Sequence, residues 1–81
     1  MNDYFFIKGE DGYIVEILSI YDRLGEKVFE IMGVPVNEPL AGWNGSFQSK
    51  KLNPGVYFYY ARIINKQKEI IEIKGDLNLI R

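Results

Sequence analysis

The sequence has no cysteine and no histidine among its 81 residues. Disulfide bonds, cysteine-based metal sites, Cys–His nucleophile pairs and histidine general bases are therefore excluded. It also has no apolar run that approaches the roughly 18 residues needed to cross a bilayer. These absences argue against most enzyme classes, and we expect a non-enzymatic domain without a cofactor or membrane insertion.

The sequence also has almost no excess of positive or negative charge, since 10 Lys and Arg residues are balanced by 11 Asp and Glu residues. A net charge of −1 gives no long-range attraction to phosphate, so we expect no nucleic-acid partner. Three acidic residues, Asp3, Glu10 and Asp11, lie on separate loop ends, which is a weak signal for a calcium site.

What the chain has is apolar and β-forming. Hydrophobic residues make up 47% and aromatic residues 15% of the sequence, and isoleucine and valine far outnumber its two alanines. β-branched and aromatic side chains suit a pleated sheet, whereas alanine-poor segments form weak helices. With turn residues at short intervals, this predicts an all-β, immunoglobulin-like antiparallel sandwich of six to seven short strands, with a small barrel as the alternative.

Alternation and turn chemistry place these strands along the chain. The expected strands are residues 4–8, 13–21, 26–31, 47–51, 56–64 and 69–79. Residues 32–42 are expected to form an irregular crossover, with or without a short edge strand. Strand 13–21 is apolar on both faces, which is typical of a central strand. In strand 56–64 one face carries Tyr57, Tyr59, Ala61 and Ile63. Gly75 interrupts the last strand and predicts a bulge or a change of direction.

Several short motifs occur in a fixed order along nearly the whole chain. They are Asn2-Asp3-Tyr4-Phe5, Ile20-Tyr21-Asp22-Arg23-Leu24-Gly25, Val28-Phe29, Trp43-Asn44-Gly45, Pro54-Gly55-Val56-Tyr57-Phe58-Tyr59 and the closing Gly75 to Arg81. In this order and spacing they resemble the gliding-motility-associated C-terminal domain, the type B sorting domain of the Bacteroidota type IX secretion system. Leu24 departs from the aromatic residue usual in that family, and the Asn/Gly/Asp-rich segment that normally precedes Asn2 is missing.

The resemblance implies a single sorting domain over residues 1–81, with the N-terminal motif segment truncated. It implies a C-terminal signal that directs a larger cargo protein through the periplasm and the type IX system to the cell surface or medium. The implied partners are the outer-membrane secretion machinery and a sortase-like surface protease that removes the signal. The alternative is a surface carbohydrate-binding or adhesion module with the same fold.

We call the residues that carry the resemblance the signature residues. They are Asp22, Arg23, Gly25, Trp43, Gly45, Gly55, Tyr57, Gly75, Leu79 and Arg81.

Several of these residues have a structural and a functional interpretation. Asp22 either caps a turn or belongs, with Arg23, to a recognition element. Trp43 is either a core residue or an exposed aromatic contact. Tyr57, Tyr59 and Tyr60 form either core and sheet edge or an aromatic platform on which sugars or nucleobases stack. An exposed edge of the sandwich also permits a homodimer through strand pairing.

Overall fold

The computed structural model describes residues 4–80 and consists almost entirely of β-structure. This confirms the all-β prediction and its lower strand count of six. The one helical element in this range is the single 3₁₀ turn η1, Pro39–Ala41. The strands are β1 (Ile14–Tyr21), β2 (Lys27–Pro35), β3 (Ser46–Phe47), β4 (Lys50–Lys51), β5 (Gly55–Ile64) and β6 (Ile70–Leu79).

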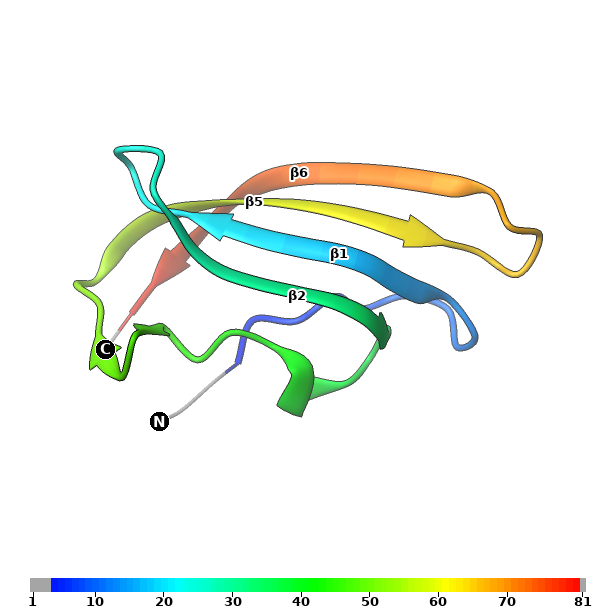
Figure 1. Cartoon of the computed structure of the whole chain (residues 1–81), viewed down its shortest axis with the longest axis horizontal. Helices are drawn as coiled ribbons and strands as arrows, with labels where there is room; N and C mark the ends of the chain where they lie inside the picture. Colours follow the sequence, from blue (N-terminus) through cyan, green and yellow to red (C-terminus); the bar gives the residue numbers. More distant parts are fainter. Residues whose placement is uncertain (1–3, 81) are drawn as a thin grey trace.

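Four of these strands form the main antiparallel sheet, in the order β2-β1-β5-β6 (Figure 1). The central positions belong to β1 and β5, the strands whose sequences are apolar on both faces. This confirms the expectation that residues 13–21 form a central strand.

The second layer is smaller and less regular. It consists of the segments before β1 and between β2 and β5, including the two-stranded β3–β4 sheet, and these run together along one side of the main sheet (Figure 1). Ile7, Val36 and Trp43 from this layer join Leu18 and Ile20 of β1 in one buried cluster. The molecule is therefore a two-layer β arrangement in which one layer is a full sheet and the other a short hairpin with extended loops.

The core face of β5 follows the predicted alternation. Tyr57, Ala61 and Ile63 are buried and belong to the core cluster, and Tyr59 packs against it. In β1 the side chains do not simply alternate between the two faces. A register shift between Val15 and Ile17 places Val15 in the core together with Leu18, three residues further on. A bulge adds one residue to a strand and thereby reverses the face of those beyond it.

The strand predicted at residues 4–8 is wrong. This segment forms only an isolated bridge between Phe5 and Trp43, joined by backbone hydrogen bonds of 2.8 Å in both directions. Further along, the backbone N–H of Asn37 donates to the Ile7 carbonyl at 2.8 Å. The backbone of this segment bonds to the crossover in the second layer and not to a strand of the main sheet. It therefore forms no continuous ladder of β-sheet hydrogen bonds.

Two other boundaries differ from expectation. Residues 47–51 form a tight hairpin between β3 and β4, with Gln48 and Ser49 at positive φ in its turn, and not one strand. The strand expected to end at residue 31 continues as β2 to Pro35, which is tolerated because β2 lies at the sheet edge.

Of the two expectations for Gly75, a bulge or a change of direction, the bulge is absent. Pairing between β5 and β6 runs without a register shift from Gly55↔Leu79 to Ile64↔Ile70, and Gly75 pairs with Tyr59. The strand does curve in its C-terminal half (Figure 1).

Among the residues that the structure describes, no helix is long and apolar enough to cross a membrane.

Candidate functional site

Asp22 organises the turn between β1 and β2. Its carboxylate Oδ1 accepts hydrogen bonds from the backbone N–H groups of Leu24 and Glu26, both at 2.9 Å. The Gly25 N–H donates to the Asp22 carbonyl at 3.1 Å, and Gly25 adopts φ +88°. The capping interpretation of Asp22 is confirmed, and the turn presents Arg23 and Leu24 to solvent.

The turn between β5 and β6 repeats this geometry at the other hairpin. Asn65 Oδ1 accepts from the N–H groups of Gln67 and Glu69, at 3.0 and 2.9 Å. Lys68 occupies the position of Gly25, with φ +67° and an N–H that donates to the Asn65 carbonyl. Residues 4–80 thus contain two turns of this type, of which only the first carries signature residues.

Tyr57 fixes the loop that leads into β5. Its hydroxyl donates to the Asn53 carbonyl at 2.7 Å, a bond back to the preceding corner like that of the tyrosine corner in immunoglobulin-type domains. Its ring meets the Trp43 ring edge-on, with 5.1 Å between centroids. Both side chains are buried, so each acts primarily in the core.

Trp43 and Gly45 hold the loop that precedes β3. The Trp43 indole N–H donates to the Ser46 carbonyl at 2.9 Å, and the Leu52 N–H donates to the Gly45 carbonyl. Gly45 is buried at φ +86°. Trp43 is therefore a core and turn residue, and the interpretation of it as an exposed aromatic contact is wrong.

The β1–β2 turn and the loop that leads into β5 meet at one end of the main sheet. A shallow groove of about 220 Å³ runs between the β1–β2 turn and the start of β5. Gly55 also pairs with Leu79, which brings the end of β6 to the same place. We call this depression the turn groove, and its lining residues are Asp22, Arg23, Leu24, Asn53, Pro54, Gly55, Val56 and Tyr57.

The remaining signature residues lie elsewhere. Gly75 sits in the middle of β6, under the ring of Tyr59. Phe5 packs against the same Tyr59 ring, with the two ring centroids 5.0 Å apart. Arg81 lies outside the described residues, so its predicted role is untested.

The proposed sugar platform of Tyr57, Tyr59 and Tyr60 does not form. Tyr57 is buried in the core and Tyr59 packs against it, whereas Tyr60 lies on the opposite face of the sheet, next in the alternation. An aromatic cluster exists instead on the outer face, where Tyr21, Phe58 and Tyr60 line a second depression with Lys74 and Asp76. This cluster was not predicted from the sequence. Its signal is the alternation along β5, which places Val56, Phe58 and Tyr60 on the face opposite the core residues.

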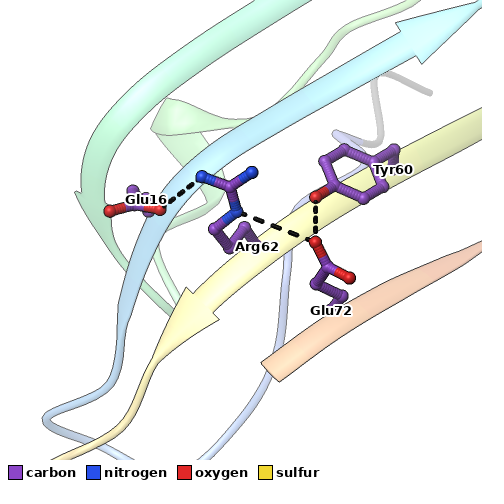
Figure 2. Close-up of polar contacts among 4 residues, drawn as sticks. All are labelled: Glu16, Tyr60, Arg62 and Glu72. Carbon is purple, nitrogen blue, oxygen red and sulfur yellow. Dashed lines mark hydrogen bonds and ion pairs between the residues drawn. The ribbon is translucent and has the colours of Figure 1, made fainter. Parts of the chain in front are cut away.

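A charged network lies on the same outer face, across β1, β5 and β6 (Figure 2). Arg62 donates to Glu16 at 3.1 Å and lies 3.9 Å from Glu72, which accepts from the Tyr60 hydroxyl at 2.6 Å. The hydrogen bond that Arg62 donates to Glu16, followed by the influence of the neighbouring Tyr60, raises the pKa of Arg62 above its usual value. Because these side chains are partly exposed to solvent, the ion pairs contribute little to the stability of the fold.

Among residues 4–80, no group of three or more Asp, Glu, His or Cys side chains is placed to hold a metal ion. The features that stand out are the turn groove with its exposed Arg23 and the unpaired edge of β6.

Comparison with protein families gives a match over residues 1–79 to the family described as CHU_C Type IX secretion signal domain. Searches of curated proteins and of solved structures find no match. The family match agrees with the order of motifs read from the sequence. Because the match covers nearly the whole chain, this protein belongs to the type IX secretion signal domain family and acts as a sorting signal that sends a cargo protein to the cell surface or medium.

Proposed function

We propose that the secretion machinery recognises the turn groove as a folded surface. The observation that supports this is the convergence of signature residues from separate parts of the chain. Asp22 and Arg23 come from the β1–β2 turn, Gly55 and Tyr57 from the start of β5, and Leu79 from the end of β6. Only the folded domain brings these residues together.

Arg23 is the residue best placed to contact a partner. It is exposed, lines the turn groove, and forms no ion pair with any residue in the described range. Neighbouring signature residues support it, since Asp22 and Gly25 shape the turn and Tyr57 anchors the facing loop. A free guanidinium on a rigid turn suits a partner that carries carboxylates.

In this proposal the domain works by recognition and performs no catalysis. It forms a single domain of a longer cargo protein, which passes through the periplasm before it crosses the outer membrane. A sortase-like protease at the surface then removes the domain. Pairing of an edge strand with a second copy is a further part of the proposal, and β6 supplies the residues for it.

A secretion assay of a fluorescent reporter fused to the domain tests this role. We expect Arg23→Glu to lower the fraction of reporter in the medium, with no change in the melting temperature of the purified domain. Lys66→Glu is the matched control, because Lys66 holds the same position in the equivalent turn at the β5–β6 hairpin. Equal export of both variants would contradict the proposal.

Deletion of residues 75–81 is a weaker test. It removes the β6 partners of Gly55 to Tyr59 and so disrupts the sheet itself. Loss of export would then follow from unfolding as readily as from loss of a contact. Point substitutions in the exposed turn separate the two causes.

A further inference from the structure

The outer side of β6 is an unpaired strand edge. Ile70–Leu79 forms the last strand in the order β2-β1-β5-β6, and no other described strand pairs with it beyond β5 (Figure 1). The strand is ten residues long, contains no proline, and pairs with β5 without a bulge. Such an edge is a template for another β-strand.

The opposite edge of the sheet is protected. In β2, Gly33 adopts φ +70° and Pro35 lacks a backbone N–H, and the pairing with β1 contains an irregularity near Tyr21. Glycine kinks, prolines and bulges are the usual devices that prevent edge pairing. The contrast indicates that β6 is the edge available to a partner.

The hydrogen-bond phase of the hairpin determines which residues face this edge. The Asn65 N–H donates to the Glu69 carbonyl at 3.0 Å, so this pair is hydrogen-bonded. Hydrogen-bonded and non-hydrogen-bonded pairs alternate along an antiparallel ladder. The residues of β6 with even numbers, from Ile70 to Asn78, therefore direct their N–H and C=O groups toward the open edge.

We propose that the β6 edge binds the β6 edge of a second copy of this chain, antiparallel and with the two-fold axis at Gly75. In this register Lys74 lies opposite Asp76 of the second copy, and the symmetry forms this pair twice. On the core face Ile73 lies opposite the second copy's Leu77, and Ile71 opposite its Leu79. The even-numbered residues form the new hydrogen bonds, as the phase of the ladder requires.

Neighbouring registers of the same phase are disfavoured by charge. An axis at Lys74 would place the two Lys74 side chains together and Glu72 opposite Asp76. An axis at Asp76 would place the two Asp76 side chains together. Like charges directly opposite each other destabilise a strand pair, whereas opposite charges and apolar pairs stabilise it.

The residue at the proposed axis also suits close approach. Gly75 and its copy on the two-fold axis would form a non-hydrogen-bonded pair, in which the two Cα atoms lie only about 4.5 Å apart. Gly75 has no side chain, and the Tyr59 ring already covers it on the core face. The two Tyr59 rings would therefore meet above the axis and extend the apolar core from one copy to the next.

Sedimentation of the purified domain over a concentration series up to about 1 mM tests the inference. We expect a reversible monomer–dimer equilibrium that Lys74→Asp or Asp76→Lys weakens about tenfold or more. The double exchange Lys74→Asp with Asp76→Lys restores the opposite-charge pairs and should restore the dimer. An equimolar mixture of the two single variants should form a heterodimer for the same reason.

Two control variants change the same charges away from β6. Lys50→Asp in β4 and Glu38→Lys before η1 alter exposed residues and should leave the equilibrium unchanged. A wild-type domain that remains monomeric throughout the series would overturn the inference, and so would a dimer that the single β6 variants leave intact. Association is measured without cells, so its failure and a failure of the proposed export role are distinguishable.

Discussion

The ring of Tyr59 lies directly over Gly75, its partner on the neighbouring strand. A Cβ atom built on Gly75 would lie 2.9 Å from the Tyr59 hydroxyl oxygen and 3.1 Å from two ring carbons. The glycine thus serves the aromatic packing of the core and not a bulge. With Phe5 on the same ring, this contact ties the second layer to the last strand of the main sheet.

We expect Gly75→Ala to destabilise the domain by about 1–3 kcal/mol, because the added methyl group overpacks against the Tyr59 ring. The sign of this change in the free energy of unfolding is informative. In a strand without such a neighbour, replacing glycine with alanine stabilises the protein by roughly 0.5–1 kcal/mol. Urea denaturation gives the free energy of unfolding. A second variant, Tyr59→Ala, should make the same glycine substitution neutral or stabilising, and an unchanged cost in that background would refute the contact.

Tyr57→Phe should lower stability by about 1 kcal/mol, because it leaves the Asn53 carbonyl without the hydroxyl that now donates to it in a partly buried place. Tyr60→Phe is the matched control on the same strand. It removes a hydroxyl whose bond to Glu72 is exposed, so its cost should be smaller. Thermal unfolding compares the two, and equal losses would show that the corner bond contributes nothing special.

Asp22→Ala should cost roughly 1–2 kcal/mol, because both the Leu24 and Glu26 N–H groups lose their acceptor. Asp22→Asn should be nearly neutral, since Asn65 makes the same two bonds in the other turn. Circular dichroism during urea titration measures both changes. If asparagine is as damaging as alanine, the negative charge of Asp22 matters and the backbone bonds do not explain its role.

The position shared by Gly25 and Lys68 gives reciprocal expectations. Gly25→Ala should destabilise by about 1–2 kcal/mol, because a residue with a Cβ is strained at positive φ. No atom lies within 4 Å of that Cβ, so the cost would come from the backbone alone. Lys68→Gly should relieve this strain and leave stability unchanged or slightly higher. Melting temperatures that move in the same direction for both variants would contradict this account.

Most strands could be predicted because their signal is local. Alternation with a period of two placed β1, β2, β5 and β6, and it assigned Tyr57, Tyr59, Ala61 and Ile63 to one face. The β1–β2 turn followed from Asp22, whose side chain bonds its own backbone, and the β5–β6 turn from its run of polar residues. Continuous apolar character also identified β1 as a central strand.

The failures occurred where distant segments decide the structure. Residues 4–8 are apolar enough for a strand, but their backbone partners are Trp43 and Asn37 in the crossover. Likewise Gly75 suggested a bulge, because nothing in its own segment reveals the Tyr59 ring above it. The bulge after Val15 depends on the register with β5 and reassigns a face that local alternation had given otherwise.

The sequence by itself determined the all-β class, the turn chemistry and the membership of the secretion signal family, because these rest on side-chain pattern and order. Only the tertiary structure decided that Asp22, Arg23, Gly55 and Leu79 meet at one end of the sheet. It also decided that Trp43 and Tyr57 are core residues and that β6 is an open edge. The physical reason is that a strand's period follows from its own backbone, whereas its neighbours are chosen by the shared core and by long-range hydrogen bonding.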